Sequence, residues 1–128
     1  MPDLGEAVAF YTAAFGLSVT RRLGPAVAEL SGFPVLLYLL EKPAGSVGAG
    51  GDARRYDRHW TPVHIDVVVD DIDAALARAI LAGAKLETPV RIEAYGKIAV
   101  LSDPFGHGLC LIQFLGRGYD EIADPAGR

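Results

Sequence analysis

The sequence predicts an α+β fold built from two βαβββ modules in tandem. One stretch, residues 61–116, has the order strand, helix, strand, strand, strand, and residues 1–43 repeat most of that order. A glycine-rich linker, residues 44–60, separates the two modules, and residues 117–128 form a C-terminal tail. Two copies of a unit of this length indicate a pair of half-domains within one structural domain.

The second module contains the clearer pattern. Residues 64–69 form an extended apolar run, and Asp71 is a suitable N-cap for a helix over Ile72–Ala82. Apolar residues recur at helical spacing within that helix, and Gly83 supplies the left-handed residue that ends it. Three further strands are predicted at residues 84–90, 96–101 and 108–114.

The first module follows the same plan from its helix onward. Asp3 caps a predicted helix over Leu4–Phe15, and strands are predicted at residues 17–23, 26–30 and 34–40. Only Met1 and Pro2 precede Asp3, so either the start is trimmed or another chain completes this sheet. Without that strand, we expect the apolar stripe of the helix to be partly uncovered at Leu4, Val8, Tyr11 and Phe15.

Composition is that of a soluble globular protein, with 51% hydrophobic and 22% charged residues. A net charge of −4 and a pI near 5.2 argue against nucleic acid as a partner. Arg54, Arg55 and Arg58 form the one basic cluster, which has acidic neighbours and is interpreted as a solvated loop.

The sequence gives no sign of membrane insertion or secretion. No basic region followed by an apolar run opens the chain, and the longest apolar run, residues 35–40, is too short to cross a bilayer. The single cysteine excludes an intramolecular disulfide and a cysteine-pair zinc site. We therefore expect a cytoplasmic protein with no membrane partner.

Three motifs are spread along the chain: Asp-Leu-x-x-Ala-x-x-Phe-Tyr-x-x-x-x-Gly-Leu at residues 3–17, His-x-x-x-x-Val-Asp-Asp at residues 64–71, and Asp-Pro-Phe-Gly-His at residues 103–107. In these motifs the chain resembles the vicinal oxygen chelate superfamily of glyoxalases, extradiol dioxygenases, fosfomycin-modifying enzymes and bleomycin-resistance proteins. The resemblance implies mixed, curved sheets that enclose a cleft, a divalent metal in the enzymatic members, and twofold dimers whose clefts often use both chains. It does not identify a reaction, because this scaffold serves many chemistries.

The resemblance also suggests two metal ligands. His64 stands where the family usually has a histidine ligand, and Cys110 stands where the metalloenzymes commonly have a glutamate. A lone thiol on an apolar strand is also typical of a small core residue. In the first module the inward-facing candidates on residues 34–40 are apolar or aromatic, namely Leu36, Tyr38 and Leu40. The sequence therefore assigns no cofactor, and a zinc, nickel, iron or manganese ion stays an alternative.

Strand alternation predicts which residues line a ligand pocket. The predicted lining consists of His64, Asp66, Val68, Cys110 and Ile112, with Tyr38, Trp60 and Tyr95 near the mouth. Apolar walls with a few polar groups suit a small organic ligand. No catalytic residue is assigned, and His107, in the turn at residues 103–107, is interpreted as structural.

Two functions of different class fit these observations. The first is a metal-free small-molecule-binding protein of the glyoxalase or bleomycin-resistance type, which binds a hydrophobic or aromatic metabolite or antibiotic. The alternative is a divalent-metal-dependent lyase or dioxygenase of the glyoxalase or extradiol type, with His64 as a metal ligand. An exposed sheet edge in the first module, together with the resemblance, predicts a homodimer.

Overall fold

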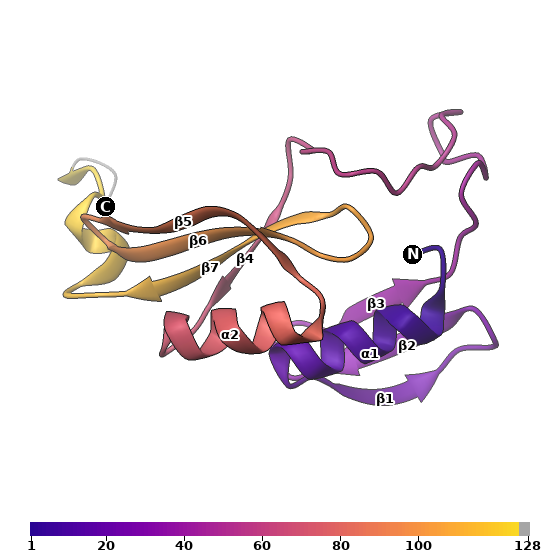
Figure 1. Cartoon of the computed structure of the whole chain (residues 1–128), viewed down its shortest axis with the longest axis horizontal. Helices are drawn as coiled ribbons and strands as arrows, with labels where there is room; N and C mark the ends of the chain where they lie inside the picture. Colours follow the sequence, from indigo (N-terminus) through magenta and orange to yellow (C-terminus); the bar gives the residue numbers. More distant parts are fainter. Residues whose placement is uncertain (126–128) are drawn as a thin grey trace.

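A computed structural model describes residues 1–125, which form two modules side by side (Figure 1). The first module contains α1 (Leu4–Phe15), β1 (Ser18–Arg22), β2 (Val27–Ser31) and β3 (Leu37–Leu40). The second contains β4 (Ile65–Val68), α2 (Ile72–Ala82), β5 (Lys85–Glu93), β6 (Gly96–Ser102) and β7 (Gly108–Phe114), followed by a short 3-10 helix, η1 (Gly118–Glu121).

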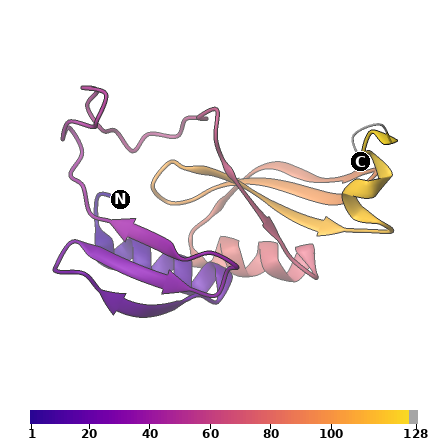
Figure 2. The same ribbon diagram turned by 180° about the vertical axis from the view of Figure 1, so that it is seen from behind.

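The second module has the predicted βαβββ topology. Its sheet has the strand order β4-β7-β6-β5, with β4 parallel to β7 and the other neighbours antiparallel. The first module forms an antiparallel sheet of order β1-β2-β3, which lies in front of α1 in Figure 2. Both sheets are open and curved, which confirms the predicted α+β class.

Two strand bounds differ from the prediction by more than one residue. The strand predicted at residues 34–40 begins only at Leu37, and the strand predicted at residues 84–90 continues to Glu93. Pro89 lies inside this longer strand, where the register shifts between Thr88 and Arg91. Proline is tolerated there because β5 is the edge strand of its sheet and needs few donors on its outer side.

Both helices begin and end at the predicted residues. Asp3 accepts a hydrogen bond from the backbone N–H of Glu6, and Gly16 ends α1 in the left-handed region at φ 68°. Asp71 caps α2 in the same way, and Gly83 ends it at φ 117°. Local capping chemistry therefore fixes both helices.

The helix N-termini carry a second cap that repeats between the modules. Oε2 of Glu41, which follows β3, accepts a hydrogen bond of 3.0 Å from the backbone N–H of Leu4. Oε1 of Gln113, on β7, accepts one of 3.0 Å from the backbone N–H of Ile72. Each module thus ties the end of its sheet to the first turn of its helix.

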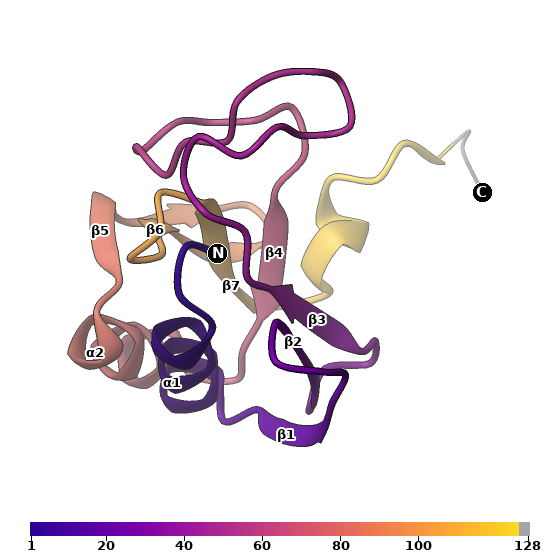
Figure 3. The same ribbon diagram turned by 90° about the vertical axis from the view of Figure 1, so that its right-hand side faces the viewer.

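The two helices pack against each other and join the modules (Figure 3). The Phe10 ring meets Phe105 of the second module edge-on at 6.4 Å, and the Tyr11 hydroxyl donates a hydrogen bond to Asp103. The expectation of an uncovered apolar stripe on α1 is therefore wrong. The second module and the neighbouring strands cover it, with Leu4 and Tyr11 buried and Val8 and Phe15 half-buried against the core.

The outer edge of β3 has little backbone pairing. The Met1 amino group donates to the Leu40 carbonyl at 2.8 Å, and the Met1 carbonyl accepts from the Lys42 N–H at 2.8 Å. Beyond these contacts the linker arches away and returns to the second module, where His59 forms a parallel bridge with His107 (Figure 3). Within residues 1–125, no helix has the length and apolar character that a membrane span requires.

Candidate functional site

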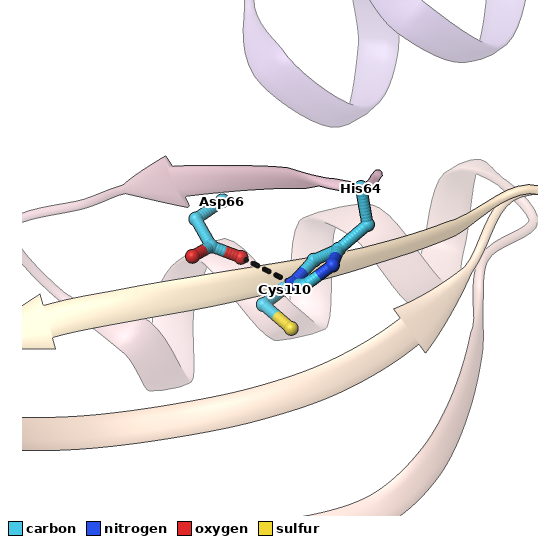
Figure 4. A group of neighbouring side chains, drawn as sticks. All are labelled: His64, Asp66 and Cys110. Carbon is cyan, nitrogen blue, oxygen red and sulfur yellow. Dashed lines mark ion pairs between the residues drawn. The ribbon is translucent and has the colours of Figure 1, made fainter. Parts of the chain in front are cut away.

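Three side chains on the second sheet bring different donor atoms together (Figure 4). Nε2 of His64 lies 3.0 Å from Oδ1 of Asp66, and Sγ of Cys110 is near both. The three donor atoms lie within 4.8 Å of one another. Among residues 1–125, these three side chains form the one group of histidine, cysteine and acidic residues close enough together to hold a metal ion.

Strand geometry explains the cluster. His64 and Asp66 are two residues apart, so their side chains point to the same face of the strand. The parallel register of β4 and β7 places Asp66 opposite Cys110. This face is the one away from the helices, since Val67 packs into the main core and Asp66 does not. The three residues therefore share one face of the sheet, while their role in lining a ligand pocket stays a prediction.

Exposure and protonation differ across the cluster. The side chains of His64 and Asp66 are 39% and 42% exposed, whereas Cys110 is buried. Burial raises the pKa of the Cys110 thiol to about 11, and the charge and hydrogen bonding of Asp66 add to this shift. Cys110 is therefore a protonated thiol that donates to Asp66, and a metal ion would have to displace its proton.

The donor set fits zinc or a similar divalent ion. Imidazole nitrogen, carboxylate oxygen and thiolate sulfur are all zinc ligands, and catalytic zinc sites use three protein ligands with a fourth position open. His64, Asp66 and Cys110 would each offer one ligand atom to such an ion, and His64 and Asp66 are the exposed members of the group.

Aromatic side chains stand on both sides of the cluster. The Trp60 ring meets His64 edge-on at 5.3 Å, and the Arg58 guanidinium lies 4.4 Å from the centre of the Trp60 ring. Arg58 also pairs with Glu87 on β5, which fixes the end of the linker against the second sheet. On the other side, Tyr95 packs against Tyr119 of η1 at 5.0 Å. The linker and the C-terminal segment therefore flank the same sheet face.

Two adjoining hollows open between the modules. The smaller has a volume of about 280 Å³, and its lining includes His64, Tyr38 and His107. The larger, of about 910 Å³, lies under the linker and shares Tyr38 and His107 with the smaller one. Of the predicted pocket residues, His64 and Tyr38 line these hollows and Trp60 contacts His64. The other predicted pocket residues are outside both linings, namely Asp66, Val68, Tyr95, Cys110 and Ile112.

The first sheet carries a polar network that was not predicted. Glu29 on β2 is 4% exposed, and its carboxylate accepts hydrogen bonds from Thr20, Arg21 and Tyr38. These hydrogen bonds, from Arg21 most of all, hold the pKa of Glu29 at about 2. The sequence analysis missed this network because the antiparallel pairing of Glu29 with Tyr38 becomes visible only in the structure.

A second unpredicted network crosses the module boundary. Oδ2 of Asp103, a residue only 2% exposed, accepts from the Tyr11 hydroxyl at 2.8 Å and lies 2.9 Å from Nδ1 of His107. Its Oδ1 accepts from the backbone N–H groups of Phe105 and His107. Burial opposes ionisation, but the hydrogen bonds from His107 and Tyr11 outweigh it and lower the pKa of Asp103. His107 does hold the turn, as predicted, yet its ring also faces both hollows.

Comparison with known proteins agrees with this architecture. Residues 1–112 match the family model described as "Glyoxalase-like domain". The chain belongs to the glyoxalase-like family. Its fold is that of the wider vicinal oxygen chelate superfamily, as the resemblance implied.

Relatives of this glyoxalase-like chain come from mycobacteria. It is 32% identical over 113 residues to "Uncharacterized protein Mb0911c" of Mycobacterium bovis, covering 82% of this chain and 72% of that protein. It is 36% identical over 110 residues to "Putative glyoxylase CFP32" of Mycobacterium tuberculosis, of which it spans only 37%. Among solved structures, the fosfomycin resistance protein FosX of Listeria monocytogenes superposes with a TM-score of 0.70 at 17% identity, covering 96% of this chain and 91% of that one.

Proposed function

We propose that this glyoxalase-like protein binds a small hydrophobic or aromatic molecule in the smaller hollow between its modules. The supporting observation is the lining of that hollow, where apolar side chains such as Leu37 and Ile65 surround the polar groups of His64 and Tyr38. A concave, mostly apolar site with a few oriented polar groups is typical of small-molecule recognition. The fosfomycin resistance protein named above shares the fold, and it supports the proposal only by analogy.

Trp60 makes this proposal testable. It is the single tryptophan of the chain and lies 5.3 Å from His64, so its fluorescence reports on this site. Titration with 1-anilinonaphthalene-8-sulfonate should give saturable binding with energy transfer from Trp60. His64→Ala should weaken that binding about fivefold or more and leave the free energy of unfolding nearly unchanged, because the side chain is 39% exposed. Unaltered affinity in His64→Ala would contradict the proposal, as would a loss of stability of several kcal/mol.

A second candidate function is a metal-dependent lyase or dioxygenase. The observation that favours it is the convergence of His64, Asp66 and Cys110 donor atoms within 4.8 Å. A bound divalent ion would act as a Lewis acid on an oxygen of the substrate. His64, Asp66 and the buried Cys110 would hold that ion.

Metal analysis separates the two functions. The protein purified without chelator should be analysed by mass spectrometry for zinc, nickel, iron and manganese, beside Cys110→Ser and Asp66→Asn. If the wild type contains stoichiometric metal and both variants contain less, the cluster is the metal site that the second function requires, and the metal-free form of the first function is overturned. Metal that neither variant reduces would reject the cluster as its site.

We also propose that the protein acts as a homodimer. Support comes from exposed apolar residues beside the free edge of β3, where Val35 and Leu36 are 70% and 50% exposed. An edge strand flanked by such residues favours pairing with another chain. Light scattering at micromolar concentration should report twice the monomer mass, and a monomer at high concentration would refute the proposal.

A further inference from the structure

His107 presents an oriented imidazole to both hollows. The Asp103 carboxylate can only accept a hydrogen bond, so Nδ1 of His107, 2.9 Å away, carries the proton. In the neutral ring this leaves a lone pair on Nε2, which has no hydrogen-bond partner among residues 1–125. The side chain is 43% exposed and lines the hollows. His107 can therefore accept a hydrogen bond from a ligand.

His59 repeats this arrangement from the linker. Its Nδ1 lies 2.7 Å from the backbone carbonyl of Asp57, which can only accept, so the neutral ring again has its lone pair on Nε2. The parallel bridge places His59 beside His107, and both line the larger hollow. Two ring nitrogens held as acceptors favour a ligand that donates hydrogen bonds, such as a hydroxyl group.

The larger hollow also carries a local excess of positive charge. Lys42, Arg54 and Arg55 line it, and none of them forms an ion pair within the described residues. Asp52 is the one carboxylate in its lining. This distribution runs against the net charge of −4 of the whole chain. Unpaired cations in a concave surface favour an anionic ligand.

Hydrogen bonds hold the linker in place where its residues line the larger hollow. The Tyr56 hydroxyl donates to the Lys42 carbonyl at 2.7 Å, and the Arg54 guanidinium donates to the Val47 carbonyl at 2.6 Å. Gly106 lies so close to the linker that an added Cβ would stand 2.5 Å from the Asp57 carbonyl oxygen. Arg54 is therefore held in place by hydrogen bonds, whereas Lys42 and Arg55 are exposed, so the interpretation of the Arg54, Arg55 and Arg58 segment as a solvated loop stays open.

We propose that the larger hollow binds a small organic anion that bears a hydroxyl group. Lys42, Arg54 and Arg55 attract the anionic group, and Nε2 of His107 accepts the hydroxyl hydrogen bond. Asp103 and Tyr11 are positioning residues that orient the ring of His107. This site goes beyond the function proposed for His64, and neither metal content nor the His64→Ala result decides it.

Three matched probes test the assignment by calorimetry at pH 8: 4-hydroxybenzoate, benzoate and phenol. The wild-type protein should bind 4-hydroxybenzoate about five- to tenfold more tightly than benzoate, as expected for one added hydrogen bond, and phenol most weakly. His107→Phe keeps a ring and should remove the preference for the hydroxyl. Arg54→Gln should weaken both acids equally, whereas Arg22→Gln, a matched loss of charge on the outside of β1, should not.

A second measurement needs no ligand. Nitrogen NMR should show His107 protonated on Nδ1 in the wild type, and Asp103→Asn should move the proton to Nε2, because the amide can donate to Nδ1. The variant should then still bind benzoate and show a smaller preference for the hydroxyl, because a phenolic oxygen accepts a hydrogen bond more weakly than a phenolic hydroxyl donates one. The proposal fails if no probe binds, if benzoate and 4-hydroxybenzoate bind equally to the wild type, if His107→Phe keeps the preference, or if His107 is protonated on Nε2.

Discussion

The two modules place different chemistry at one position of the same scaffold. Tyr38 stands three residues before the helix-capping Glu41, and Cys110 stands three residues before the equivalent Gln113. In the second module this position adjoins half-exposed His64 and Asp66, whose donor atoms can still take a ligand.

In the first module the same position belongs to a closed network. The Tyr38 hydroxyl donates to Glu29 at 2.6 Å, and Arg21 and Thr20 occupy the other sites of that carboxylate. A carboxylate satisfied by three side chains stabilises a sheet and has little capacity left for a ligand. The comparison teaches that one module supplies reactive donors and the other mainly supplies a wall, Tyr38, for the hollow between them.

The largest expected effect tests whether the modules fold as one unit. Leu30 on β2 and Leu111 on β7 are both fully buried, so Leu30→Ala and Leu111→Ala should each cost about 2–5 kcal/mol of unfolding free energy. Because α1 packs on α2, each variant should shift a single unfolding transition followed by circular dichroism in urea. Two separate transitions, with only one moved by each variant, would show that the modules unfold independently.

The next prediction uses acid to separate the modules. The pKa of Glu29 is about 2 in the folded protein, below its ordinary value of 4.5. The stability that Glu29 contributes is therefore present above about pH 4.5 and is lost as the pH falls toward 2. Glu29→Gln should make the decline in stability between pH 5 and pH 2 shallower, as measured by urea unfolding at each pH.

Asp120→Asn is the control for this experiment. It removes the same charge from η1, outside the Glu29 network, and should leave the slope of that decline unchanged. Asp103, whose pKa is also lowered, remains in both variants and contributes equally to their acid sensitivity. An acid profile for Glu29→Gln that matches the wild type would show that the Arg21, Tyr38 and Thr20 contacts do not stabilise the ionised carboxylate in solution.

Local signals explain how much of the fold could be predicted. Asp3, Gly16, Asp71 and Gly83 act within one helical turn, so both helices were predicted to the residue. The covering of the α1 stripe was missed because its partners, such as Phe105, are far away in the sequence. Hydrophobic periodicity shows that a face must be buried but does not say what buries it.

In the candidate site, too, residues marked by local signals were predicted and contacts between distant residues were missed. His64 and Cys110 were available from the family resemblance, and Asp66 from strand alternation. The hydrogen bond from Tyr11 to Asp103 joins residues 92 positions apart, and no short sequence pattern predicts it. His107 was interpreted as structural because it lies in the Asp-Pro-Phe-Gly-His turn at residues 103–107. Its second role depends on where the linker returns, which becomes visible only once His59 is placed beside it.

The smallest expected effect concerns the repeated helix cap, where the modules differ by one charge. Glu41 and Gln113 each accept from the first N–H of a helix at 3.0 Å, so the hydrogen-bond geometry is matched. A carboxylate also interacts favourably with the positive end of the helix, whereas an amide lacks that charge. Glu41→Ala should therefore cost about 1–2 kcal/mol and Gln113→Ala about 0.5–1 kcal/mol.

Charge exchange isolates the electrostatic part of this difference. Glu41→Gln should cost about 0.3–1 kcal/mol and Gln113→Glu should stabilise by a similar amount, both measured by chemical denaturation at low salt. High salt should reduce both changes, because the helix-end interaction is screened. A neutral or destabilising Gln113→Glu at low salt would mean that a second negative charge beside Asp71 gains nothing from the positive end of α2. The two caps would then not be equivalent.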